Sequence, residues 1–281
     1  VVSLCRVYIG SMIMISINTN YGGLFAAKAA QDSQRIVDQA MNRLSTGKKI
    51  NASKDDSAGQ AIAMRLNAEI SGLAVASRNA SDGQALIDTA EGALKESHSV
   101  LIRMRELAVQ AQNGTLQDAD KTALGAEFDA LEAEITRISD NTTWAGLKIL
   151  DGSTTTFSFR VGTSENISHT ISDMAATAIG GFTSAHTVAQ ASTIAVLDAS
   201  IAKVSEERAK LGAVSNRLDS TVTNLDQIRV NLTASKGRIE DADFAEETGN
   251  LAKSQILQQA ATAMVAQANA SKSTVLTLIQ S

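Results

Sequence analysis

The sequence predicts a mainly α protein, an elongated antiparallel helical bundle or coiled coil that carries a small β-hairpin region. The 281 residues include no proline, and only 3% are aromatic. Apolar residues recur at alternating steps of three and four along most of the chain, which is typical of helices that pack side by side. This balance favours long packed helices over a compact sandwich or a doubly wound sheet.

The first predicted helix spans residues 23–44 and leads into a polar run, NRLSTGKKINASKDDSAGQAIA, at positions 42–63. Gly47 is expected to break this helix, and Asp55 and Asp56 favour the start of the next because acidic side chains stabilise a helix N-terminus. A helix of about 75 Å should follow. Its seam positions are Ile62, Leu66, Glu69, Leu73, Ala76, Ala80, Gly83, Ile87, Ala90, Leu94, Ser97, Leu101, Met104, Ala108 and Ala111.

A shorter helix and a hairpin are predicted next. Asn113-Gly114 is a good helix stop, and Asp118 or Asp120 is expected to cap a helix that includes residues 124–138. The pattern then changes to strand alternation, so residues from about 150 to 182 are predicted as a small β-hairpin region. Phe157, Phe159 and Val161 alternate with polar residues in the first strand, Gly162 to Asn166 supplies the turn, and the return strand is expected to contain Ile167, His169 and Ile171.

The heptad pattern resumes in the second half of the chain. Apolar residues again step by three and four between Ile194 and Leu232, which predicts a helix of about 50 residues. A break is expected near Lys236-Gly237, followed by a last helix, rich in Ala and Gln, over residues 240–281.

The sequence offers no enzyme chemistry and no cofactor site. Gly47-Lys48 is followed by Lys49 and lacks the spacing of a phosphate-binding P-loop. The three histidines are scattered, so a zinc centre is unsupported. The net charge of −5 and the lack of a basic stripe make nucleic acid a poor partner.

The first thirteen residues, VVSLCRVYIGSMI, resemble a signal peptide only weakly and contain the single cysteine, Cys5. We expect this stretch to be a mis-assigned leader, with Met14 as the true start and Met12 as the competitor. One cysteine excludes a disulfide framework. No stretch reaches the roughly 18 apolar residues that a membrane span needs.

Several long motifs resemble bacterial flagellin. The segments ISINTNYGG, NRLSTGKKINASKDDSAGQAIA, LIRMRELAVQAQNGT and LKILDGSTTTFSFRVG are each similar to segments of that family. So is the C-terminal block RIEDADFAEETGNLAKSQILQQAATAMVAQANASKSTVL, which begins at Arg238. The similarity covers residues 14–281.

The resemblance implies a structural subunit that polymerises into the flagellar filament for swimming motility. Residues 14–55 with 239–281 would form the inner coiled-coil domain D0, and residues 56–238 the helical D1 domain with its hairpin. The outer variable domains of longer flagellins are missing, because only about ten residues, 175–184, separate the hairpin from the returning helix.

The resemblance also implies partners and a location. They are other flagellin subunits, the flagellar export machinery and an export chaperone, filament cap and junction proteins, and host immune receptors, with neither nucleic acid nor membrane among them. The subunit would be secreted and extracellular, in the filament. Its end helices are expected to be disordered in the monomer because they are buried only against neighbours.

Two receptor surfaces are implied by position. Arg103, Leu107 and Glu127 match residues on the convex D1 surface that a vertebrate Toll-like receptor recognises in the family. The segment matching the plant-recognised epitope contains Asn42, Arg43, Leu44, Ser45, Thr46, Gly47, Ile50, Asn51, Lys54, Asp55, Asp56, Gly59 and Ile62.

Two alternatives remain at this stage. A hook–filament junction protein shares flagellin-like ends and the same export pathway. An intracellular coiled-coil signalling module would show the same heptads.

Overall fold

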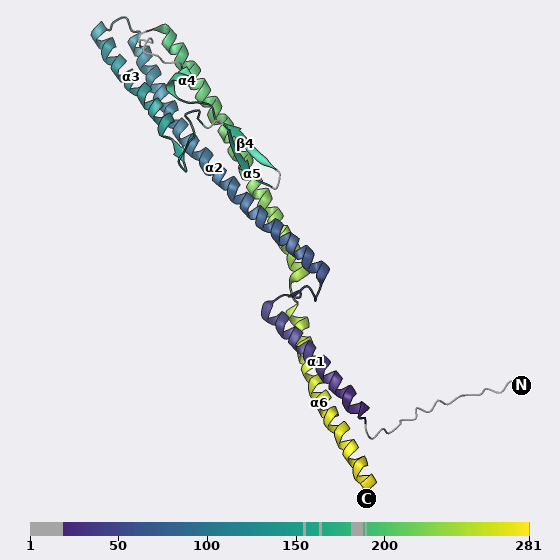
Figure 1. Ribbon diagram of the computed structural model, residues 1–281. Helices are drawn as coiled ribbons and strands as arrows, with labels where there is room; N and C mark the ends of the chain where they lie inside the picture. The colour runs from purple at the N-terminus through teal and green to yellow at the C-terminus, as the bar shows by residue number, and fades with distance from the viewer. Residues whose placement is uncertain (1–18, 154–155, 163–164, 181–187, 189, 281) are drawn as a thin grey trace, which may run out of the picture. The chain divides into compact units, whose positions relative to one another are not determined.

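The computed structural model describes residues 19–153, 156–162, 165–180, 188 and 190–280, and the expected leader and both candidate start methionines lie outside this range. A mainly α fold with a small antiparallel hairpin is confirmed (Figure 1). The described elements are α1 Tyr21–Thr46, α2 Ser57–Ala111, α3 Asp118–Asn141, β1 Thr143–Trp144, β2 Leu147–Lys148, β3 Thr156–Arg160, β4 Asn166–Thr170, α4 Ala176–Gly180, α5 Ala191–Glu240 and α6 Phe244–Gln280.

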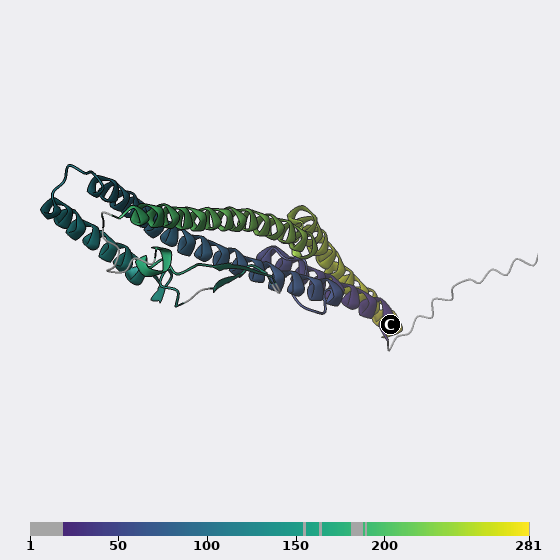
Figure 2. The same cartoon turned by 90° about the horizontal axis from the view of Figure 1, so that it is seen from above.

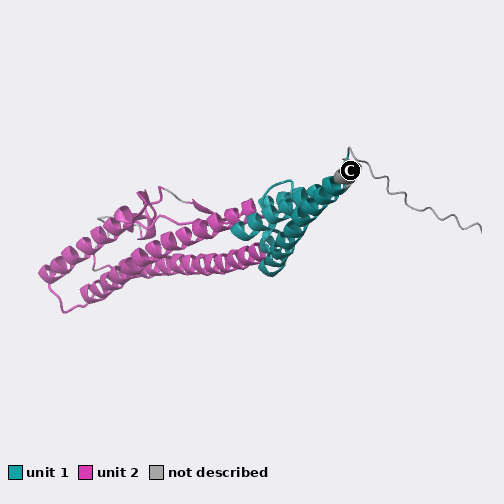
Figure 3. Ribbon diagram, turned by 90° about the horizontal axis from the view of Figure 1, so that it is seen from below, with its two compact units in different colours: residues 1–65, 235–281 teal, residues 66–234 magenta. Residues whose placement is uncertain are grey.

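The chain divides into two compact units, coloured separately in Figure 3. Unit 1 contains residues 1–65 and 235–281, and unit 2 contains residues 66–234. In unit 1, α1 and α6 pack against each other in opposite directions. Side-chain hydrogen bonds set this direction, between Asn20 and Asn269, Gln34 and Gln258, and Arg43 and Glu247.

The contact between α1 and α6 is made by small side chains. They recur at seven-residue intervals on each helix and are at most 8% exposed. Side chains of this size let two helix backbones approach closely, because the distance between helix axes depends on the side chains at the contact. We call this set the small-residue seam: Ala26, Ser33 and Ala40 on α1, and Ser254 and Ala261 on α6.

The core of unit 2 lies between α2, α3, α5 and the β3–β4 hairpin, and Figure 2 shows α2 and α5 running side by side. Ion pairs between Glu91 and Arg208 and between Arg105 and Asp198 require these two helices to be antiparallel. The predicted heptad seams are confirmed by burial from Ala76 to Ala111 of α2 and along α5, whereas the predicted seam positions Ile62 and Glu69 near the start of α2 are exposed. The fully or almost fully buried positions at seven-residue spacing are Ala80, Ile87, Leu94, Leu101 and Ala108 on α2, and Leu197, Val204, Leu211 and Leu218 on α5.

The predicted hairpin packs against this core. Phe157 lies opposite His169, and Phe159 lies opposite Ile167. A Cβ atom on Gly83 of α2 would lie only 2.8 Å from Cδ1 of Phe159, so the missing side chain at Gly83 permits this close approach. The helix α4 also lies within the region predicted as the hairpin, after β4.

Three local features differ from the sequence prediction. A second small hairpin, β1–β2, turns at Ala145 and Gly146, whose φ angles of 49° and 83° are left-handed. The break expected near Lys236-Gly237 falls later, at residues 241–243, because α5 continues to Glu240; one interior glycine weakens a helix by only about 1 kcal/mol. For α3 the N-cap is Gln117, so neither Asp118 nor Asp120 holds that position; Asp120, at the third helical position, accepts a hydrogen bond from the Gln117 N–H.

Within the described ranges, we find no helix with the length and apolar character that spanning a membrane demands.

Candidate functional site

The polar run beginning at Asn42 ends α1 and forms its connection to α2, within unit 1. Gly47 terminates α1 with φ 69°, and its N–H donates a hydrogen bond of 2.8 Å to the Arg43 carbonyl. This left-handed backbone favours glycine because it lacks a Cβ atom. The expectation that Gly47 breaks the first helix is therefore confirmed.

This connection pairs with the one between α5 and α6. The Lys49 N–H donates to the Glu240 carbonyl at 2.7 Å, and the Ala242 N–H donates to the Gly47 carbonyl at 3.0 Å. Lys48 and Asp241 form the isolated antiparallel bridge between these hydrogen bonds. Backbone groups that a loop would otherwise leave to water are thus satisfied by a segment distant in sequence.

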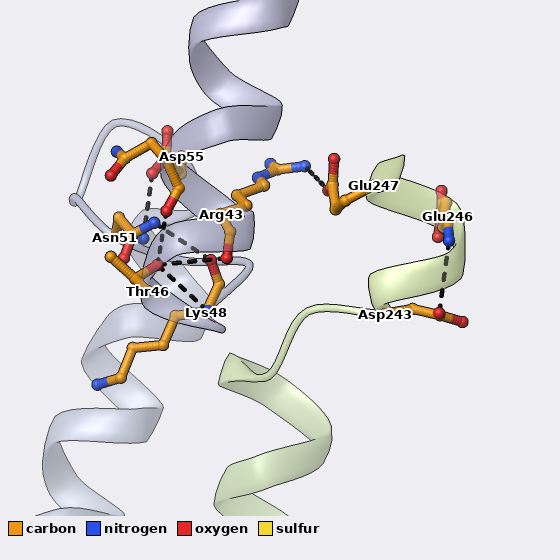
Figure 4. Close-up of polar contacts among 9 residues, drawn as sticks. Arg43, Thr46, Lys48, Asn51, Asp55, Asp243, Glu246 and Glu247 are labelled. Carbon is orange, nitrogen blue, oxygen red and sulfur yellow. Dashed lines mark hydrogen bonds and ion pairs between the residues drawn. The ribbon is translucent and has the colours of Figure 1, made fainter. Parts of the chain in front are cut away.

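We call the two paired connections, between α1 and α2 and between α5 and α6, the joint. Acidic side chains stabilise the helix starts there (Figure 4). Asp56 precedes α2 and accepts a hydrogen bond of 2.9 Å from the Gly59 N–H. Asp243 does the same for α6, with the Ala245 N–H at 2.8 Å. Asp55 instead closes the turn before α2 by accepting from the N–H groups of Asn51 and Ala52 at 3.2 and 3.1 Å. Capping of this kind satisfies donors that the first turn leaves free.

Two ion pairs hold the same joint. The Arg43 guanidinium donates to the Glu247 carboxylate at 2.7 Å, and the two side chains are 21% and 9% exposed. Lys48 donates to Glu240, and this hydrogen bond lowers the pKa of Glu240 below its ordinary value, with a smaller contribution from Lys236. The polar groups of the run therefore serve helix ends and ion pairs.

The described ranges contain no group of three or more His, Cys, Asp and Glu residues placed to hold a metal ion.

The residues expected at the Toll-like receptor surface lie close together in unit 2. The Arg103 guanidinium on α2 donates to the Glu127 carboxylate on α3 at 2.8 and 3.1 Å, and the two side chains are about half exposed. Arg103 also pairs with Glu106, and these hydrogen bonds, Glu127 first, raise the pKa of Arg103. Leu107 is 1% exposed and belongs to the core of unit 2.

The residues of the expected plant epitope are divided between surface and interior. Exposed positions are Asn42, Ser45, Thr46, Lys54, Asp56 and Ile62. Ile50 and Gly59 are buried against each other, since a Cβ atom on Gly59 would lie 2.8 Å from Ile50 Cδ1. Arg43, Leu44, Gly47, Asn51 and Asp55 are half-buried in the folded joint.

A large apolar surface lies outside the small-residue seam of unit 1. Phe25 is 80% exposed and Ile256 is 66% exposed, although both belong to well-formed helices. We call this set the assembly surface: Tyr21, Leu24, Phe25, Ile36 and Met41 on α1, and Phe244, Ile256, Leu257 and Met264 on α6. The sequence heptads did not indicate it, because they only identify the buried side of each helix.

Large apolar side chains exposed on well-formed helices are typical of structural subunits that assemble with other copies. Comparison with known proteins identifies the family. The model of the bacterial flagellin N-terminal helical region matches residues 17–155, and that of the C-terminal helical region matches residues 194–279.

Similar proteins agree with this match. A flagellin of Halalkalibacterium halodurans is 45% identical over 249 residues, covering 86% of this chain and 91% of that protein. A flagellin of Bacillus subtilis is 38% identical over 302 residues, covering 94% of this chain and 99% of that protein. The chain belongs to the bacterial flagellin family and is a structural subunit of the extracellular flagellar filament.

The fold alone would not separate a flagellin from a junction protein. A structure described as a flagellar hook-associated protein from Vibrio parahaemolyticus has a TM-score of 0.58, covers 66% of this chain and 100% of its own, and is 16% identical. The identity to flagellins over most of the chain therefore favours the filament subunit over the junction protein and the intracellular signalling module.

Proposed function

We propose that unit 1 is the part of this flagellin through which neighbouring subunits contact each other along the inside of the filament. On this assignment residues 14–55 with 239–281 are domain D0, and residues 56–238 are domain D1. The observation that carries the proposal is the assembly surface, where large apolar side chains of α1 and α6 face outward. Burying one such side chain against a neighbour contributes about 1.5–3 kcal/mol, and the contribution is repeated in every subunit.

The substitution Phe25→Ser tests this proposal. Because Phe25 is 80% exposed, the change should leave the helix content and thermal midpoint of the monomer unaltered. Elongation of seeded filaments should slow by about tenfold or more. Each contact between neighbouring subunits would lose a buried aromatic side chain that contributes at least about 1.4 kcal/mol. The matched control is Phe25→Leu, which keeps an apolar side chain and should elongate nearly as the parent does. Unchanged elongation by Phe25→Ser would contradict the proposal.

We further propose that the chain leaves the cell through the flagellar export machinery with an export chaperone. Cap and junction proteins would be partners of the finished filament. Family membership supports this route. Localisation in export-deficient cells tests it, with the prediction that the subunit is retained inside and that no filament forms. A subunit that still reached the medium would require another route.

Recognition by host receptors is a second proposal. Arg103 and Glu127 are exposed and joined to each other, so a receptor would meet them as one charged pair, whereas Leu107 would act by supporting the helix beneath them.

The plant epitope would be available only after the joint unfolds or is cleaved, because Ile50 and Gly59 are buried there. A receptor assay with Arg103→Ala should lose response, and the synthetic segment 42–63 should outperform the folded chain.

A further inference from the structure

The turn between α2 and α3 contains Asn113-Gly114, the only place in the sequence where glycine follows asparagine. Both residues are exposed and lie between the two helices. Backbone hydrogen bonds hold the turn on either side. The Asn113 N–H donates to the Gln110 carbonyl at 3.0 Å, and the Leu116 N–H donates to the Asn113 carbonyl at 3.2 Å. The backbone is therefore fixed while the Asn113 side chain is open to water.

The same turn polarises the side-chain amide of Asn113. The Thr115 N–H donates a hydrogen bond of 3.2 Å to Oδ1 of Asn113. A donor on this oxygen stabilises the negative charge that develops there when a nucleophile attacks Cγ. The next nitrogen along the chain belongs to Gly114, whose N–H has no hydrogen-bond partner among the described residues. A Cβ atom on Gly114 would meet nothing beyond its chain neighbours within 4 Å, so the space beside this nitrogen is open.

We propose that Asn113 is a site of spontaneous deamidation. The Gly114 nitrogen gives up its proton and bonds to Cγ of Asn113, and the Cγ–Nδ2 bond breaks so that ammonia leaves with that proton. Water then opens the resulting succinimide ring. Opening at Cγ leaves an aspartate, whereas opening at the backbone carbonyl carbon leaves an isoaspartate, whose main chain runs through the former side chain. The reaction consumes only water, so modified subunits accumulate with time after folding.

The two Asp-Gly pairs of the chain lack these conditions. Asp82-Gly83 lies inside α2, where the helix holds the backbone. At Asp151-Gly152, the hydrogen bonds that Ser153 donates lower the pKa of Asp151. Its carboxylate is therefore kept ionised, and an anion is a poor target for a nucleophile. Only at Asn113 does an uncharged, polarised carbonyl meet an open glycine nitrogen outside a helix.

The modification changes the connection between α2 and α3. A negative charge just after the last turn of α2 is unfavourable, because the last carbonyl groups of a helix already carry partial negative charge. An isoaspartate also lengthens the main chain between the hydrogen bonds of Gln110 and Leu116, so the Leu116 N–H no longer faces the carbonyl of residue 113. The turn should therefore be held more weakly in modified subunits.

Peptide mapping of the purified full chain, incubated at pH 6 and at pH 8.5, tests the proposal. Cleavage after Arg105 and Lys121 releases a peptide in which Asn113 is the only asparagine. Its mass should rise by the difference between a hydroxyl and an amino group, and faster at pH 8.5, because base removes the Gly114 proton. Isoaspartate should be found among the products, since it forms only through the ring. The Leu116 amide should exchange its hydrogen faster in the incubated chain than in fresh chain.

The matched control is Gly114→Ala, which should fold as the parent does because a Cβ atom fits there. It should deamidate about tenfold or more slowly, since a side chain on the attacking residue hinders the approach of its nitrogen. An equal rate in Gly114→Ala, or aspartate without isoaspartate, would overturn the proposed route. Deamidation of the synthetic peptide Glu106–Lys121 without deamidation of the folded chain would show that the turn protects Asn113, and would overturn the site itself.

Discussion

At the residue scale, Gly47 and Gly92 show how one amino acid has opposite effects in two backbone conformations. Gly47 ends α1 with φ 69°, whereas Gly92 lies in the interior of α2. A Cβ atom would meet no other atom within 4 Å at either position, so the two sites differ in backbone conformation and not in space. Left-handed backbone costs an L-residue roughly 1–2 kcal/mol, and glycine inside a helix costs about 1 kcal/mol relative to alanine.

We therefore predict that Gly47→Ala lowers the free energy of unfolding by about 1 kcal/mol, while Gly92→Ala raises it by a similar amount. Urea unfolding of the two variants and the parent at one pH measures both effects. Because the chemical change is the same, each variant is the control for the other. Equal and like-signed shifts would show that the Gly47 cap is not formed.

At Gly83, close packing against Phe159 leaves no room for a side chain. A Cβ atom there would lie within 3.1 Å of three ring atoms of Phe159, and an aromatic ring held in a hairpin has little freedom to withdraw. Gly83→Ala should therefore displace the β3–β4 hairpin and destabilise unit 2 by about 1–3 kcal/mol, as overpacking does. Hydrogen exchange of the hairpin amides checks this expectation, with Gly92→Ala on the same helix as the reference. Parent-like exchange in Gly83→Ala would contradict the close contact.

At the scale of elements, the helices and the main hairpin followed from the sequence because their physics is local. Periods of seven and two identified which sides of α2, α5 and β3 are buried. The β1–β2 hairpin was missed because two-residue strands have no period and their turn includes Ala145, which rarely adopts positive φ. The pairing of α1 with α6 joins segments far apart in the sequence, so no local pattern reveals it, and only the family resemblance predicted it.

The joint between elements should respond to acid through Glu240. Its pKa is lowered mainly by the hydrogen bond from Lys48, so the folded state is stabilised while the carboxylate is ionised. That stabilisation is present above the ordinary pKa of glutamate and is lost as pH falls through the lowered folded value.

We predict that Lys48→Gln destabilises unit 1 at pH 7, where Glu240 is ionised, and has a smaller effect at an acid pH at which Glu240 is protonated. Urea unfolding at these two pH values measures the free energy of unfolding of the variant and the parent. Lys28→Gln serves as the control, since Lys28 makes only an exposed contact of 3.9 Å with Asp32. An effect of Lys48→Gln that did not change with pH would rule out the Glu240 linkage.

At the scale of the whole molecule, the sequence predicted the family, which the comparisons confirm, but not which surfaces of the chain contact other subunits. The buried contact between α1 and α6 is made by the small-residue seam, while the large apolar side chains of the assembly surface are exposed. We therefore expect the free subunit to be stably folded in unit 2, which has a buried core of its own, and unit 1 to be stabilised only by contacts with neighbouring subunits. Assembly would supply the missing contacts.

Hydrogen exchange of α1 and α6 in the free subunit and in the assembled filament tests this claim most directly. We predict that these amides exchange rapidly in the free subunit. In the filament their exchange should be slower by well over tenfold, because neighbouring subunits cover the assembly surface. Amides of the α2 core, around Leu94 and Leu101, should be protected in both states and provide the internal reference. Strong and equal protection of α1 and α6 before and after assembly would contradict the account.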